Sequence, residues 1–155
     1  MGKTSNQQSA NGWTDEYTIT YKDFSVDNAG TLADDATLAF TYTVPVGSQV
    51  RNVAAHLVTA FTDSGSGDQL NVVVGDGGSG GANGYLTTAL LHTTETEITY
   101  VANTGTYLDN ENGKVYTTAD TIDILFTPNA ATGDPYSLNE LTAGEIVFKF
   151  DIAQI

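Results

Sequence analysis

Alternation of apolar and polar residues is the dominant pattern of the chain between residues 36 and 76. In residues 38–44 every second side chain is apolar, and the same spacing returns in residues 50–61 and 70–74. The apolar positions of the first segment are Leu38, Phe40, Tyr42 and Val44. Because successive side chains of a strand point to opposite faces, this pattern predicts antiparallel strands with one buried and one solvated face.

Similar patterns on both sides predict further strands, separated by turn residues such as Asn112-Gly113, a pair typical of tight hairpins. The segment 85–91 is short and apolar, and it is ambiguous between a strand and one helical turn. The remaining predicted strands lie at 17–22, 97–101, 114–118, 121–126 and 146–152. The total predicts an all-β fold: an antiparallel two-sheet β-sandwich or jelly roll of about eight or nine strands. No repeat of fixed period favours a solenoid or propeller.

The 155 residues fit one domain, long enough to bury about 70% of its unfolded surface. Residues 1–14 are polar and unpatterned, which predicts an N-terminal arm, and such termini are commonly disordered. Residues 15–155 form the predicted sandwich domain. Lys3 and Trp13 are the candidate partner-binding residues of the arm. Trp13, the only tryptophan, is a large aromatic that can anchor the arm on a partner or pack back onto its own sandwich.

The charge balance is strongly acidic, with 19 Asp and Glu against five Lys and Arg and a net charge of -14. Binding to nucleic acid is not expected, because it requires cations that replace phosphate counterions. Such a surface suits solubility or a basic protein partner. The start does not resemble a signal peptide and no apolar run reaches membrane-span length, so we expect synthesis in the cytosol and no membrane partner. Without cysteine, disulfides and thiolate metal sites are excluded.

Catalytic motifs are missing from the sequence. His56 and His92 do not form a pair at zinc-binding spacing, and no serine stands in a nucleophile-elbow motif. Gly-Lys-Thr occurs only at residues 2–4, before any predicted strand, so it is no phosphate loop. Asp120 and Asp123 lie three apart on a predicted strand and point to opposite faces. We therefore expect a protein that is not an enzyme and that uses no cofactor.

Calcium is the remaining small-ligand hypothesis, because clustered loop carboxylates can supply its six to eight oxygens. Asp109 and Glu111 share a turn, but Gly113 stands where an EF-hand loop needs a ligand. Other carboxylates that flank glycine-rich loops are Asp63, Asp68 and Asp76. Asp and Asn also favour turns for backbone reasons. No metal site is predicted, and Asp109 and Glu111 are the candidate ligands if calcium binds.

Several segments, taken in order, resemble small β-sandwich proteins of tailed bacteriophages, a group that includes capsid decoration or cement proteins. The resemblance covers about residues 17–155 and leaves the arm uncovered. It rests on "VPVGSQVRNVAAHLVTAF" (44–61), "LNVVVGD" (70–76), "GYL" (84–86), "YTTADTIDILFTP" (116–128) and "TAGEIVFKFDI" (142–152).

The resemblance implies a non-enzymatic structural role in a virion. Decoration proteins bind the outside of the assembled head and clamp neighbouring capsid subunits against the pressure of the packaged DNA. By this resemblance the partner is the major capsid protein, the protein forms a homotrimer on the capsid, and it lies on the capsid exterior after synthesis in the host cytoplasm. No interface residue is carried over by the resemblance.

Two other functions fit the same pattern. One is a head-fibre or tail-associated virion component. The other is a carbohydrate-binding or adhesin module, in which exposed aromatic rings would stack on sugars. The tyrosines expected to serve that purpose are Tyr85, Tyr107, Tyr116 and Tyr136.

Overall fold

The computed structural model describes residues 2–5, 13–63, 69–77, 81, 83–91, 99–102, 104–108, 113–129 and 136–155. These residues form two antiparallel sheets. The larger sheet has the order β1-β2-β10-β4-β7, and β8 also pairs with β4. Its strands are β1 (Gly2–Ser5), β2 (Asp15–Thr20), β4 (Ser48–Thr62), β7 (Thr99–Ala102), β8 (Lys114–Tyr116) and β10 (Ala143–Gln154).

The smaller sheet has the order β3-β9-β5-β6. Its strands are β3 (Leu38–Val44), β5 (Gln69–Gly75), β6 (Leu86–Leu90) and β9 (Asp120–Asn129). Apart from β1 and β8, the strands give the orders β2-β10-β4-β7 and β3-β9-β5-β6, in which the chain crosses repeatedly from one sheet to the other. This order is that of a jelly roll. The expected all-β two-sheet sandwich is therefore confirmed, and the ambiguous segment 85–91 contributes strand β6.

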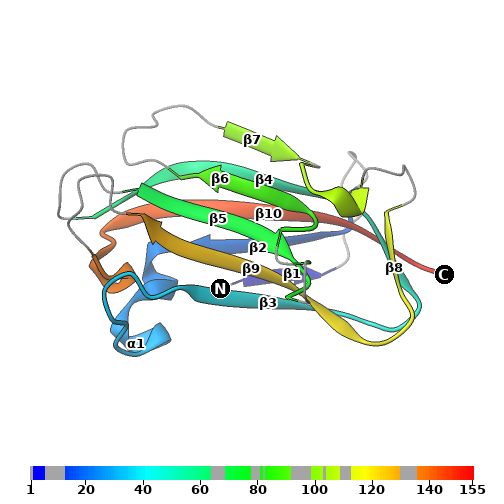
Figure 1. Cartoon of the computed structure of the whole chain (residues 1–155), viewed down its shortest axis with the longest axis horizontal. Helices are drawn as coiled ribbons and strands as arrows, with labels where there is room; N and C mark the ends of the chain where they lie inside the picture. The colour runs from blue at the N-terminus through cyan, green and yellow to red at the C-terminus, as the bar shows by residue number, and fades with distance from the viewer. Residues whose placement is uncertain are drawn as a thin grey trace.

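Short helical turns cap the strands. They are the 3-10 helices η1 (Tyr21–Phe24), η2 (Thr106–Leu108) and η3 (Leu138–Glu140), and the α-helix α1 (Val26–Ala29). The sequence did not predict α1. It lies at one end of the sandwich, whereas β8 and the last residues lie at the opposite end (Figure 1). We call these two ends the α1 end and the β8 end.

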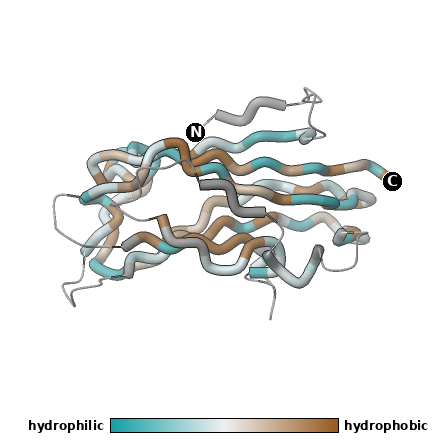
Figure 2. The backbone as a smooth tube through the Cα atoms, turned by 90° about the horizontal axis from the view of Figure 1, so that it is seen from above, coloured by the Kyte–Doolittle hydropathy of each residue, from teal (hydrophilic) through white to brown (hydrophobic). Residues whose placement is uncertain are grey.

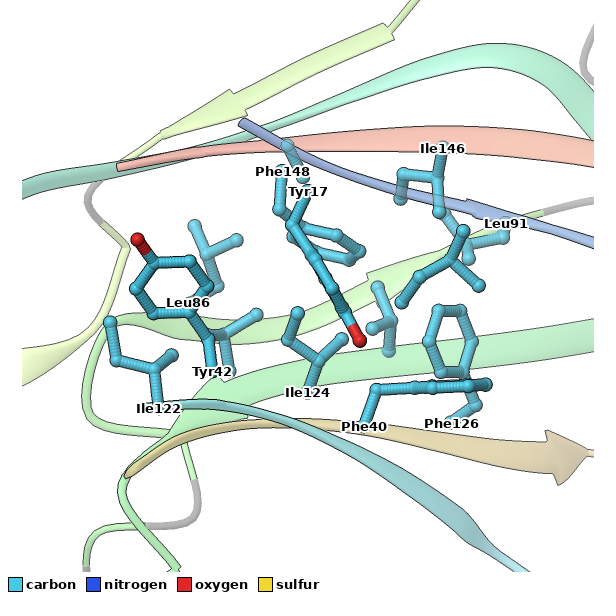
Figure 3. Close-up of a cluster of buried hydrophobic side chains, with 14 of the residues drawn as sticks. Tyr17, Phe40, Tyr42, Leu86, Leu91, Ile122, Ile124, Phe126, Ile146 and Phe148 are labelled. Carbon is cyan, nitrogen blue, oxygen red and sulfur yellow. The ribbon is translucent and has the colours of Figure 1, made fainter. Parts of the chain in front are cut away.

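The core lies between the facing sides of the two sheets. Figure 3 shows Tyr17, Ile146 and Phe148 of the larger sheet opposite side chains from β3 and β9. Those from the smaller sheet include Phe40, Ile122, Ile124 and Phe126. Hydrophobic and hydrophilic stretches are interleaved along the strands in Figure 2, as the alternating sequence pattern requires. Each strand thus gives one face to the core and one to the surface.

Phe24 on η1 fills the space between the sheets toward the α1 end. Its ring is fully buried and lies edge-on to three other rings, with centroids 5.0 Å from Phe126, 5.4 Å from Phe40 and 5.9 Å from Phe61. Edge-to-face contacts at this spacing are favourable beyond the area they bury. The turn that follows β2 is therefore held by the core, although the sequence there shows no strand or helix period.

The N-terminal arm is partly built into the larger sheet. Residues 2–5 form β1 and pair with residues 15–18 of β2. The polar sequence of β1 contributes backbone pairing at the sheet edge, whereas the apolar residues of β2 contribute to the core. Beyond β1, residues 6–12 lie outside the described residues.

A β-bulge in β10 shapes the outer face of the larger sheet near the α1 end. The register between β10 and β4 shifts on both sides of Glu145, and Gly144 has a φ of 137°. A Cβ atom at Gly144 would overlap the ring of buried Phe61. Glycine is required here both for the backbone angle and for the close approach of the ring.

Substitution Gly144→Ala should lower the free energy of unfolding by about 4 kcal/mol, because backbone strain adds to overlap with Phe61. The matched control is Gly30→Ala. Gly30 has a φ of 74°, but a Cβ atom added there would meet no other atom within 4 Å, so only strain remains and the loss should be about 2 kcal/mol. Urea unfolding of both variants measures the difference. Equal losses would contradict the contact with Phe61 as the cause.

Asn139 ties together the loops of the α1 end. Its Oδ1 accepts a hydrogen bond from the Leu32 amide at 2.7 Å. Its Nδ2 donates to the carbonyl oxygens of Phe24 at 2.6 Å and Gly30 at 3.1 Å. Ser137, which caps η3, donates to the carbonyl of Leu32 at 3.0 Å. One amide side chain thus gives hydrogen-bond partners to the backbone groups of Phe24, Gly30 and Leu32, which lie on either side of α1.

Substitution Asn139→Ala should cost about 3 kcal/mol of unfolding free energy, since three backbone groups lose their partner. Asn28→Ala is the control. Asn28 is exposed and donates only within its own turn, to Lys22 O and Ser25 Oγ, so its loss should stay below about 1 kcal/mol. Chemical denaturation curves give both values, and an Asn139 variant as stable as the control would refute the role of this side chain.

Candidate functional site

A cluster of titratable side chains lies at the β8 end, around Lys114. The Lys114 ammonium forms an ion pair with Asp76, whose side chain is only 7% exposed. It also lies 4.0 Å from the ring centroid of Tyr107 and 5.1 Å from that of Tyr116. The Tyr107 hydroxyl donates to Asp76 Oδ1 at 2.8 Å. A buried carboxylate is thereby paired with both a cation and a hydrogen-bond donor, which is the arrangement that burial of charge requires.

Next to this group, the buried hydroxyls of Tyr85 and Tyr116 share a hydrogen bond. Tyr85 Oη and Tyr116 Oη lie 2.6 Å apart, and the Tyr85 ring packs edge-on against Tyr107 with centroids 5.2 Å apart. Burial raises the pKa of Tyr85 well above its usual range, and burial raises the pKa of Tyr116 to about 12. Burial also lowers the pKa of Lys114, and the nearby Asp120 carboxylate partly offsets this by raising the same pKa.

The cluster links three separate segments of the chain. Asp76 follows β5, Tyr107 lies on η2, and Lys114 and Tyr116 begin and end β8. The Tyr107 amide donates to Gly84 O at 2.8 Å, and a Cβ atom at Gly84 would overlap the Tyr107 ring. The Asp76 and Tyr107 side chains occupy the space that Gly81 and Gly84 leave open. The cluster therefore acts as a clamp that holds β8 and η2 to the end of β5.

The buried tyrosines make stability depend on alkaline pH. In the unfolded chain a tyrosine loses its proton near pH 10, whereas folded Tyr116 keeps it to about pH 12, so the unfolded state binds fewer protons in this window. The stabilisation is complete below about pH 10 and is lost as the pH rises toward about 12. Urea unfolding across this window should show the fall. In the Tyr116→Phe variant, the loss of unfolding free energy between about pH 10 and about pH 12 should be smaller than in the wild type by about 2 kcal/mol. A wild-type unfolding free energy that stays constant over this range would contradict the prediction.

A tight turn between β3 and β4 completes the surface of the β8 end. Gly47 has a φ of 77°, its amide donates to Tyr116 O at 2.8 Å, and its carbonyl accepts from the Ile155 amide at 2.8 Å. Three large apolar residues are exposed here: Val46 in the turn at 56%, Val115 at 46% and Ile155 at 69%. These three residues were not predicted as a site from the sequence. The signal in the sequence that could have indicated them is an apolar residue at an outward-facing strand position, such as Val115.

The basic side chains of the described surface are mostly neutralised by the protein's own carboxylates. Arg51 pairs with Asp151 at 2.6 Å and Lys149 pairs with Glu16 at 3.2 Å, in addition to the pair at Lys114. Exposed carboxylates include Asp27, Asp34, Asp35, Asp120 and Glu140. The described surface is therefore acidic, as the net charge predicts.

One shallow pocket of about 290 Å³ lies on the outer face of the larger sheet, where the Gly144 bulge opens space beside β2. Its lining includes the Tyr21 ring, Lys22 and Glu145. The volume is at the lower end of that of small-molecule sites. Its groups could hydrogen-bond a small polar molecule, but Lys22 already lies over the Tyr21 ring at 5.9 Å from its centroid.

The residues singled out from the sequence are dispersed. His56 is half-buried on β4, on the face opposite Val53, Ala55 and Leu57, as expected. Trp13 is half-buried and precedes Thr14, whose amide donates to Phe150 O at 2.8 Å. Lys3 lies on β1, but its side chain is outside the description. The other candidates outside the described residues are His92, Asp68, Asp109 and Glu111.

The expectation of exposed tyrosines for sugar stacking was wrong. Tyr85 is fully buried, and Tyr116 and Tyr136 are 3% and 4% exposed. Tyr107 is half-buried, with Lys114 over its ring. Tyr85 and Tyr116 face inward and share a hydrogen bond, and Tyr136 belongs to the buried core, so these rings support the core and the clamp. The carboxylate Asp76, which flanks a glycine-rich segment, forms the ion pair with Lys114.

Within the described part of the chain, no three His, Asp or Glu side chains are grouped closely enough to hold a metal ion. Among the described helices, none has the length and apolar character needed to cross a membrane. Comparison of the chain with protein families, with characterised proteins and with solved structures gives no match.

Proposed function

We propose that this protein is a structural component of a phage virion: a decoration protein that binds the outer surface of the head through contacts with the major capsid protein. The resemblance of segments 44–61 and 142–152 to small phage β-sandwich proteins supports this function. These segments form most of β4 and β10, the central strands of the larger sheet. Jelly rolls serve viral capsids, lectins and other proteins, so the fold alone does not select the function.

The acidic surface is the observation that carries the proposal. With a net charge of -14 and its cations paired to its own carboxylates at Lys114, Arg51 and Lys149, the protein offers a basic partner a complementary surface. Charge complementarity accelerates encounter with such a partner and disfavours acidic ones. A protein that lies outside a shell can bind in this way without touching the DNA inside it.

A decoration protein works as a rigid clamp, and both ends of the sandwich are fixed by side chains. Asn139 holds the α1 end through three backbone groups, and the Lys114–Asp76 pair holds the β8 end. A preorganised body loses little conformational entropy on binding, so more of its contact energy stabilises the complex.

The proposed homotrimer forms on the head. Copies that each carry a charge of -14 repel one another in solution, and attachment to neighbouring sites on a basic surface offsets that repulsion. The free protein is therefore monomeric in this account, and threefold grouping appears only on the particle.

Co-sedimentation with heads assembled without the protein tests this function. The purified protein should bind these heads and raise the temperature at which they release DNA. Because the attraction is electrostatic in part, raising salt from about 0.05 M to about 0.5 M should weaken binding about tenfold. An unrelated acidic protein of similar size is the control. Absence of the protein from purified virions, together with no binding to heads, would refute the proposal.

A further inference from the structure

Three of the five exposed large apolar side chains in the described part of the chain lie around one turn at the β8 end. They are Val46, Val115 and Ile155, and the other two, Val26 and Val58, lie elsewhere. Single exposed apolar residues are normal on a protein surface, but grouped ones mark interaction sites. We call these three residues the turn patch.

Hydrogen bonds bring the three residues of the turn patch together. The amide of Gly47, next to Val46, donates to the carbonyl of Tyr116, next to Val115. The carbonyl of Gly47 accepts from the Ile155 amide, and the Gln154 side chain donates to Val46 O at 3.0 Å. Three segments that are distant in the sequence therefore bring their exposed apolar residues together at the β8 end. Figure 1 shows β8 and the last residues at this same end.

The patch stands on a rigid base. Val115 lies between Lys114, which is held by Asp76, and Tyr116, which is buried and bonded to Tyr85. Because side chains alternate along a strand, the inward position of Tyr116 turns Val115 outward. A Cβ atom at Gly47 would lie 2.9 Å from Gln154 Nε2, so the turn is closely packed against the end of β10.

The charges around the patch indicate what kind of surface covers it. Asp120 is exposed at the start of β9, and Asp151 and Asp76 already neutralise the nearby cations Arg51 and Lys114. Asp123 adds a further carboxylate on β9. A second copy of the chain would bring the same excess of carboxylates and would be repelled. The complementary occupant is a different protein with an apolar centre flanked by Lys or Arg.

We infer that the turn patch is the surface by which this protein docks onto its partner, and that the partner presents apolar side chains flanked by basic residues. The inference rests on the proposed function, which makes that partner a capsid subunit. A few desolvated side chains near the centre of a contact supply most of its binding energy, and flanking charges set orientation and specificity. The jelly roll then stands end-on, with its β8 end toward the partner and its α1 end away from it.

The test compares the double variant Val46→Ser and Val115→Ser with the control variants Val58→Ser and Val26→Ser. All four side chains are 40–56% exposed, so each variant should melt within about 2 °C of the wild type. In co-sedimentation with heads that lack the protein, the double variant should bind about tenfold more weakly, and each control within about twofold of the wild type.

The outcomes separate the inference from the proposed function. If the wild type does not bind heads, both the proposed function and the inferred docking surface are wrong. If the wild type and the double variant bind equally, or if a control loses as much affinity, the docking surface alone is wrong. Light scattering of the free protein gives a further check. A wild-type dimer that the double variant abolishes would show that a second copy covers the patch and would overturn the inference.

Discussion

The two sheets bury their facing apolar stripes against each other, and this burial determines both the core and the surface of the protein. Because the side chains of each strand alternate, the same segments that fill the core also set the surface. Phe24 extends this core beyond the strands and fixes the turn after β2 through its contacts with Phe40, Phe61 and Phe126. The bulge at Gly144 is placed by the same packing, since Phe61 occupies the space of a side chain there.

The two-residue period was enough to predict the sandwich and most of its strands, because burial of one strand face is a local property of the sequence. The period did not predict β1, whose residues are polar, and it left the segment of β6 ambiguous. It was not enough to predict what depends on distant contacts. Asn139 appears in the sequence as an ordinary loop residue, yet it binds backbone groups more than a hundred positions away. The tyrosines Tyr85 and Tyr116 were expected at the surface, and in the folded chain both are buried and share a hydrogen bond.

The candidate site was harder to predict than the fold for the same reason. Nothing local in the sequence connects Val46 with Val115, and the hydrogen bonds of Gly47 bring them together only in the folded chain. Likewise Asp76 and Lys114 are separated by the segments of β6 and β7, and their pairing turns a loop carboxylate into part of a clamp. The acidic composition did indicate the sign of the surface. The proposed location of the contact surface depends on the fold, because only the folded chain brings the three residues of the turn patch together.

The most direct test of this account is a particle reconstruction that resolves the orientation of the bound protein. Docking through the turn patch predicts that the β8 end contacts the capsid surface near Lys or Arg side chains, with α1 farthest from the shell. Contact through the α1 end or through the outer face of the larger sheet would contradict the account, even if the protein decorates the head.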